Sequence, residues 1–197
     1  LDNYYRKKFE RGGEITPRNF WFVEIKQSSS FLGFDPTKPF VESYHKNQAT
    51  KRWADKKLDG NVEKQFFSSS ILGPDFVPFA VIKRRLIILP ILIKNNTVRM
   101  ISSQEPSIIN SDFKKYLEKV EKIWKENATA KLRIKPIYDQ INYNGNLIQQ
   151  NPKSGFKVIY AAGGTNVTSC IIHQKENYEF KINDSSLSVN TFFADAA

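Results

Sequence analysis

The chain has 197 residues, which is long enough to bury a hydrophobic core and short enough to form one domain. Its 30 lysine and arginine residues outnumber its 20 acidic residues, so the net charge is +10 and polyanions such as nucleic acid are favoured partners. The single cysteine, Cys170, excludes an intramolecular disulfide and a thiolate zinc site. No run of about twenty apolar residues is present to span a membrane. We therefore expect a cytoplasmic protein without a membrane partner.

The first part of the chain predicts strands separated by irregular loops. Residues 19–26 (NFWFVEIK) are dense in aromatic and β-branched side chains, which is typical of a strand. Residues 31–41 contain Gly33, Pro36 and Pro39 and are expected to be irregular, with a further short strand over 40–44.

A basic window over residues 46–57 is the first candidate for contact with nucleic acid. It contains Trp53 among five cations, which are Lys46, Lys51, Arg52, Lys56 and Lys57. An indole in such surroundings can stack on a base or on a guanidinium. The alternative is a solvated loop in which Trp53 fills a local apolar patch, and this is the commoner role of a lone tryptophan.

The most apolar stretch, residues 77–93, predicts buried strand because branched aliphatic residues are abundant and Pro90 would break a helix. Lys83, Arg84 and Arg85 interrupt it, and three adjacent cations cannot all enter a core without partners. The chain can form a hairpin with Lys83 and Arg84 at its tip, or one strand whose side chains alternate between two faces. In both arrangements a cation reaches solvent beside a rigid sheet, so we expect Arg84 and Arg85 to be replaceable without unfolding the domain.

The second half of the chain predicts one clear helix, over about residues 111–127. One apolar stripe runs along it, a mixed-charge face lies opposite, and Ser111 or Asn110 can cap its start. Residues 131–144 are predicted to be partly extended, and further strands are expected over 97–101, 156–161, 167–173, 178–182 and 187–193. Residues 1–197 are therefore predicted to form a single α+β domain, a twisted mixed β-sheet of about eight strands with this amphipathic helix packed on it.

Catalytic signatures are scarce in the sequence. The Walker loop, the GxGxxG loop, the GxSxG elbow and the Asn-Pro-Pro-Tyr type motif that holds a flipped adenine are all missing. Glu14 followed by Glu24 and Lys26 is similar to the acid…ExK pattern of nucleases, in which two carboxylates hold Mg²⁺ and the lysine positions the attacking water. A surface strand produces so short a pattern easily. A Mg²⁺-dependent nuclease that uses Glu14, Glu24 and Lys26 stays open, as does a protein-interaction domain whose basic surface is merely solvated.

One segment carries a family resemblance. Residues 11–25 (RGGEITPRNFWFVEI) resemble the RxGAxxxPRxFxFV pattern in the C-terminal half of large adenine-specific methyltransferases. These belong to fused type II restriction–modification enzymes, which share a TaqI-like specificity domain. The order of later blocks is similar, from the basic loop with Trp53 through GNVEKQFFSSSILGPDFVPF to VIYAAGGTNVTSCII. Glu14 departs from the pattern, because the family usually has alanine after the glycine at this position.

The resemblance implies a target recognition domain, excised from a larger methyltransferase or restriction enzyme. Such a domain grips double-stranded DNA and reads its bases, while a methyltransferase domain of the same parent chain transfers the methyl group. It implies no catalytic residue, no metal and no cofactor in this segment, with S-adenosylmethionine serving the parent's catalytic domain. Endonuclease activity of the parent stays open.

The expected DNA contacts follow from the chemistry of the side chains. Lysines position a protein on phosphates without reading sequence, and the candidates are Lys46, Lys51, Lys56, Lys57 and Lys153. A guanidinium can bridge two guanine acceptors, so the candidates for base edges are Arg18, Arg52, Arg84 and Arg85. Trp53 completes the predicted set as a stacking residue.

Overall fold

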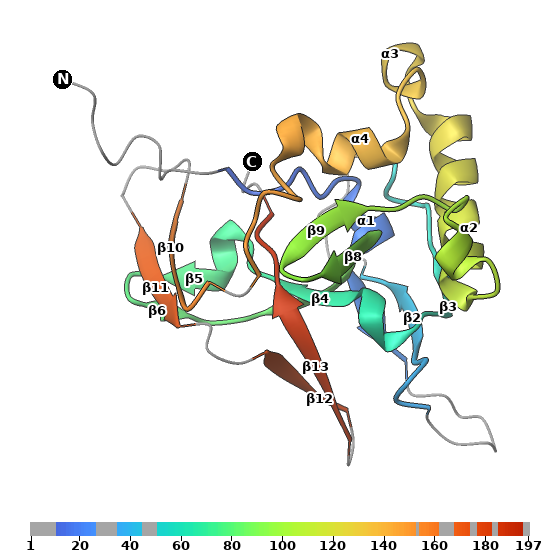
Figure 1. The fold of residues 1–197 in the computed structure, drawn as a ribbon. Coiled ribbons are helices and arrows are strands. Elements are labelled where there is room, and N and C mark those ends of the chain that lie inside the picture. The colour runs from blue at the N-terminus through green and yellow to red at the C-terminus, as the bar shows by residue number, and fades with distance from the viewer. Residues whose placement is uncertain are drawn as a thin grey trace.

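A mixed, curled β-sheet runs through the middle of the molecule (Figure 1). The computed structural model describes residues 11–26, 35–44, 51–152, 154–161, 168–173, 177–182 and 185–194. Within these ranges the chain forms thirteen strands in five sheets together with four α-helices. The predicted α+β class is therefore confirmed. None of the described helices has the length and apolar character that crossing a membrane requires.

The central sheet has two parts that meet at a single bridge. Four strands lie in the order β12-β13-β4-β7, with β13 and β4 parallel and the other pairs antiparallel. A bridge between Phe22 and Ile87 connects β7 to the antiparallel set β1-β2-β3, which gives a path of seven strands. The bounds are β1 (Val23–Ile25), β2 (Phe40–Ser43), β3 (Asp59–Asn61), β4 (Phe67–Ser70), β7 (Arg85–Ile88), β12 (Tyr178–Ile182) and β13 (Ser185–Thr191).

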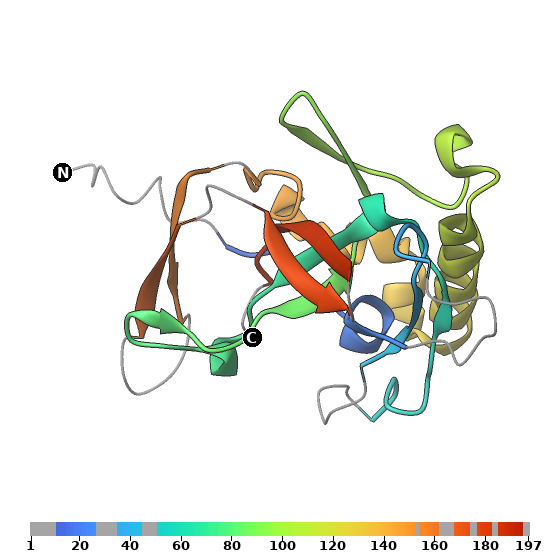
Figure 2. The same cartoon turned by 90° about the horizontal axis from the view of Figure 1, so that it is seen from below.

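The other strands form three hairpins rather than extending the sheet, so the predicted mixed sheet of about eight strands corresponds to this path of seven strands. They are β5 (Phe76–Val77) with β6 (Ala80–Val81), β8 (Ile91–Lys94) with β9 (Thr97–Met100), and β10 (Phe156–Tyr160) with β11 (Ser169–His173). Hairpins β5–β6 and β10–β11 lie at the end of the molecule opposite the long helix (Figure 1 and Figure 2). They share a small core of their own, made of Ile71, Phe76, Cys170 and Ile172.

The apolar stretch of residues 77–93 contradicts both predicted arrangements. The chain turns at Pro78 and Phe79, where Val77 pairs with Ala80, and not at Lys83 and Arg84. A proline fixes the backbone angle that the second position of a tight turn requires, which explains why the turn forms there. Pro90 separates β7 from β8, so the stretch becomes several short strands instead of one or two long ones.

Two segments predicted to be extended are helical instead. The helix α1 (Arg18–Trp21) replaces the first half of the strand predicted over 19–26. Residues predicted to be partly extended form α3 (Ala130–Arg133) and α4 (Ile137–Ile141). Helix α4 buries Ile137 and Ile141, which are four residues apart on one face, so tertiary packing selects the helix there.

The predicted long helix is confirmed as α2 (Asp112–Asn127), which covers the sheet beside β3. The Ser111 hydroxyl caps it by accepting a hydrogen bond from the backbone N–H of Lys114 at 3.1 Å. A second cap comes from far away in the sequence. The Glu63 carboxylate accepts hydrogen bonds from the N–H groups of Asp112 and Phe113, at 2.8 and 3.0 Å.

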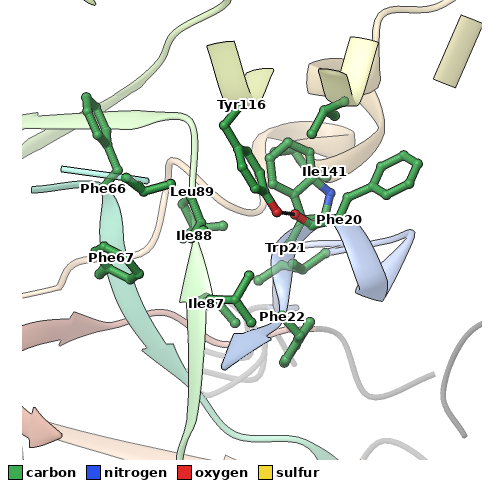
Figure 3. Close-up of a cluster of buried hydrophobic side chains, with 14 of the residues drawn as sticks. Phe20, Trp21, Phe22, Phe66, Phe67, Ile87, Ile88, Leu89, Tyr116 and Ile141 are labelled. Atoms are coloured by element: carbon green, nitrogen blue, oxygen red, sulfur yellow. Dashed lines mark hydrogen bonds between the residues drawn. The ribbon is translucent and has the colours of Figure 1, made fainter. Parts of the chain in front are cut away.

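The main core lies between α2 and the strands that follow α1 (Figure 3). Phe20, Trp21 and Phe22 are fully buried beside Ile87 and the residues that follow it. The hydroxyl of Tyr116, on α2, donates a hydrogen bond to the carbonyl of Phe20 at 2.7 Å. This bond satisfies the polar tip of a buried aromatic residue and ties α2 to α1.

We expect Glu63→Ala to lower the free energy of unfolding by about 1–2 kcal/mol, because two N–H groups at the start of α2 lose their acceptor. Urea denaturation followed by circular dichroism measures the change. Glu118→Ala on the exposed face of α2 is the matched control and should stay within about 0.5 kcal/mol of the parent. Equal losses in the two variants would contradict a capping role for Glu63.

Candidate nucleic-acid interface

A cleft of about 390 Å³ is lined by residues from β1, from the start of β7 and from β12. Phe22, Ile25 and Phe180 contribute apolar walls. Four lining residues are basic and one is acidic. The basic residues are Lys83, Arg84, Arg85 and Lys181, and the acidic residue is Glu24. The curled sheet therefore places cations from two distant segments around one hollow.

Arg85 is anchored by a two-pronged ion pair with Asp75. Its Nε and Nη2 atoms donate to the two carboxylate oxygens of Asp75 at 2.5 and 2.6 Å. The two side chains are only 12% and 4% exposed, and the Asp75 carboxylate also accepts from the N–H of Leu72. The hydrogen bonding that Arg85 donates to Asp75 raises the pKa of Arg85.

This ion pair argues against the prediction that Arg85 contacts base edges and is replaceable. Two of its nitrogens are engaged by Asp75, and the third, Nη1, is buried without a hydrogen-bond partner in the described part of the chain. A base needs an exposed donor, and removing Arg85 would leave the Asp75 charge buried and unpaired. Arg85 is therefore a structural residue.

Arg84 has a different environment, because neighbouring residues at the start of a strand point to opposite faces. Its Nη1 donates to the Thr191 hydroxyl at 2.7 Å, and its guanidinium lies 4.7 Å from the centre of the Tyr178 ring. Burial lowers the pKa of Arg84. No carboxylate in the described ranges forms an ion pair with it. Arg84 is thus a rigidly held cation whose charge is not neutralised.

Lys83 and Arg18 are two further cations near Arg85. The ammonium of Lys83 and the guanidinium of Arg85 lie 5.5 and 5.3 Å from the centre of the Tyr44 ring. Arg18, at the start of α1, has a lowered pKa, chiefly because of burial and then because of the positive charge of Arg85. The structure therefore brings Arg18 near Arg85 and Asp75, although they are far apart in the sequence.

Trp53 is not available for stacking on a base, which corrects its place among the predicted DNA contacts. Its side chain is 7% exposed. The ring stacks on Trp124 at 5.5 Å with an angle of 5° between the planes, and it meets Phe20 edge-on at 5.3 Å. The alternative role as a plug in an apolar patch is confirmed.

The cations around Trp53 stay at the surface but do not line the cleft. Lys51, Arg52 and Lys57 are exposed, and Lys56 pairs with Asp55 at 2.9 Å. The Asn19 side chain donates to the carbonyl of Lys56 at 2.7 Å and to that of Trp53, which fixes this segment to α1. The two other predicted phosphate contacts, Lys46 and Lys153, lie outside the described residues.

Two residues of the nuclease pattern, Glu24 and Lys26, lie on β1 and directly after it, beside Glu42. Glu24 lies opposite Glu42 on β1 and β2, and the Lys26 ammonium is paired with the Glu42 carboxylate. Glu14 follows Gly13, whose N–H donates to the carbonyl of Phe193. Among the described residues, no group of three His, Cys, Asp or Glu side chains is placed to hold a metal ion.

Sequence reasoning missed Asp75, Tyr44, Tyr178 and Lys181. Lys181 lies on a predicted strand, but nothing in the local pattern indicates that this strand faces Lys83. Asp75 stands in the turn-rich segment GPDF, where a solvated aspartate is the ordinary expectation. Only the contact with Arg85 shows its role.

Comparisons of the chain with protein-family models, with curated proteins and with solved structures found no match. The resemblance to the TaqI-like specificity domain therefore stays a prediction from the sequence.

Asp75→Ala should lower the free energy of unfolding by about 3–5 kcal/mol, because it leaves the Arg85 charge mostly buried without its partner. Replacing both residues, Asp75 by alanine and Arg85 by methionine, should recover part of that loss. Chemical denaturation of the three proteins gives the comparison.

Lys26→Ala provides the control for that experiment, since its ion pair with Glu42 is exposed and should contribute about 1 kcal/mol or less. If Asp75→Ala lowers the free energy of unfolding no more than Lys26→Ala does, the buried ion pair does not stabilise the position of β7.

Proposed function

We propose that this chain is the target recognition domain of an adenine-N6 DNA methyltransferase or restriction–modification enzyme, and that it binds double-stranded DNA sequence-specifically at the cleft. The observation that carries the proposal is the charge of Arg84, which lies directly before β7, contacts Thr191 and Tyr178, and forms no ion pair with a described carboxylate. The sequence resemblance and the net charge of +10 agree with it.

The positive charges in and near the cleft favour an anionic ligand. Burial lowers the pKa of both Arg18 and Arg84, which means that their charged forms lose hydration where they lie. In the described part of the chain neither Lys83 nor Lys181 forms an ion pair. A phosphate placed at the cleft would supply negative charge beside Arg84, Lys83 and Lys181, together with charge-assisted hydrogen bonds.

The geometry suggests different roles for the cations. Lys83 and Lys181 are exposed at the rim, where flexible ammonium groups suit phosphates. The guanidinium of Arg84 uses one nitrogen for Thr191, so its remaining N–H groups can bridge the acceptors of a guanine in the major groove. Exposed Lys51, Arg52 and Lys57 offer further phosphate contacts along the duplex.

Methyl transfer belongs, in this proposal, to a separate domain of the parent protein. The sequence lacks the loops and the adenine-holding motif that such chemistry requires. The segment itself is therefore expected neither to bind S-adenosylmethionine nor to methylate DNA.

Binding to a short fluorescent duplex of mixed sequence should weaken by orders of magnitude between about 50 and 200 mM salt, because counterions are released from the phosphates. Lys83→Ala and Lys181→Ala should each reduce the slope of log K against log salt by about 0.9. Fluorescence anisotropy at several salt concentrations measures both quantities.

Lys122→Ala on the exposed face of α2 is the matched control and should leave the slope unchanged. Salt-independent binding, or the same effect from Lys122→Ala as from the two cleft variants, would exclude the cleft as the phosphate-binding surface.

Arg84→Ala should cost about 1–3 kcal/mol of binding free energy on a duplex selected by the wild-type protein from a random pool, and little on mixed-sequence DNA. Arg84→Lys should not restore selectivity, because an ammonium cannot bridge two acceptors. Arg99→Ala serves as the control, since Arg99 is paired with Glu105 on the β8–β9 hairpin. Failure of the wild type to enrich any sequence, or equal weakening on both duplexes, would rule out base reading by Arg84.

A further inference from the structure

The tip of the β5–β6 hairpin carries an exposed aromatic residue in an unfavourable backbone conformation. Phe79 is 92% exposed and has a φ of 69°, in the left-handed region. Proline followed by a residue of positive φ is the pattern of a type II turn, whose third position normally carries glycine or asparagine. A bulky aromatic at such a position is an outlier.

Nothing in the described fold uses the ring of Phe79. The turn is held by backbone contacts that any residue could make. Val77 pairs with Ala80, and the N–H of Phe79 donates to the carbonyl of Ser169 on β11 at 3.1 Å. Glycine or asparagine would make the same contacts with less strain. The ring is therefore available for a contact outside the described residues, and the backbone contacts of two hairpins hold the turn that carries it.

The base of the hairpin carries cations. Of the three that follow β6, Arg85 is paired with Asp75, whereas Lys83 and Arg84 form no ion pair among the described residues. The carbonyl of Asp75 accepts hydrogen bonds from the N–H groups of Ile82 and Lys83, at 2.8 and 3.1 Å, so the base of the hairpin is tied to the rim of the cleft.

The tip lies close to the cleft along the chain. Phe79 and Lys83 are four residues apart, and β6 (Ala80–Val81) leads from the turn toward the cleft. Proteins that insert an apolar wedge beside phosphate-binding cations unstack one base step and bend the duplex.

Resting on the DNA binding proposed above, we propose that Phe79 is a wedge that inserts between neighbouring base pairs of DNA bound at the cleft. The ligand of this residue is therefore a stacked base step of double-stranded DNA. A stiff turn suits this role, because a fixed ring loses little conformational freedom on insertion.

The alternative partner is a protein. The outer face of the β10–β11 hairpin exposes Phe156, Val158 and Ile171, which are 66%, 64% and 68% exposed. Val158 pairs with Ile171 across the hairpin, so these side chains share one face. An apolar surface of this kind is typical of protein contacts. The test must separate the single ring of Phe79 from this neighbouring face.

The experiment uses a duplex selected by the wild-type protein and maps unstacked bases in the complex. Permanganate modifies unstacked thymines and diethyl pyrocarbonate modifies unstacked purines, so a wedge produces a reactive step whatever its sequence. We expect such a step with the wild type and with Phe79→Trp, and its loss with Phe79→Ala and Phe79→Asn. Affinity for this duplex should fall about tenfold in the two variants that lose the ring.

Two controls show that the loss is specific. Phe79→Asn should keep or raise the melting temperature, because asparagine tolerates a positive φ, so its defect cannot come from unfolding. Val158→Ala, an exposed apolar residue on the neighbouring hairpin, should leave both the reactive step and the affinity unchanged.

Each other outcome overturns the proposal. A duplex bound without any unstacked step, or a step that persists in Phe79→Ala, rejects the wedge while leaving DNA binding intact. If sedimentation shows self-association that both Phe79→Ala and Val158→Ala abolish, with no change in base reactivity, Phe79 belongs to a protein contact. If the wild type binds no duplex at all, the proposed function fails as well.

Discussion

The ion pair between Arg85 and Asp75 is the interaction on which the surrounding structure depends. Asp75 stands where β5 begins and Arg85 where β7 begins, so one bidentate contact closes the segment between them. The same carboxylate accepts from the N–H of Leu72, and the carbonyl of Asp75 accepts from Ile82 and Lys83. The β5–β6 hairpin is thereby held at a fixed angle to the central sheet. A buried charge pair of this kind specifies geometry more than it adds stability, because desolvation offsets much of the attraction.

The anchoring of one arginine determines the exposure of its neighbour. Adjacent strand residues point to opposite faces, so fixing Arg85 toward Asp75 and Tyr44 directs Arg84 toward Thr191 and Tyr178. Arg85 is neutralised by Asp75, whereas no carboxylate among the described residues pairs with Arg84. Two residues of the same type, side by side in the sequence, therefore have different electrostatic environments.

The excess of positive charge is not spread evenly over the molecule. On the β1–β3 sheet and α2, several lysines are matched by carboxylates: Lys26 by Glu42, Lys38 by Glu63 and Asp112, and Lys119 by Asp59. The cleft is lined by four basic residues and one acidic residue, Glu24, and nearby Asp75 is paired with Arg85. The position of the un-neutralised charge, rather than its total, indicates where an anionic partner would bind.

The sequence by itself determined the α+β class, the long helix and most of the later strands, because these follow from local periodicity and capping. Helix α2 was predictable since one face of its 3.6-residue repeat is apolar and Ser111 precedes it. Tertiary structure decided the rest. Short helices such as α4 form because packing buries one face of them, and the stretch of residues 77–93 divides where Pro78 permits a turn. The burial of Trp53 against Trp124 and the convergence of Arg84 and Lys181 depend on contacts between residues far apart in the chain. No local pattern encodes such contacts, because charge and aromaticity are visible in a sequence while their partners are not.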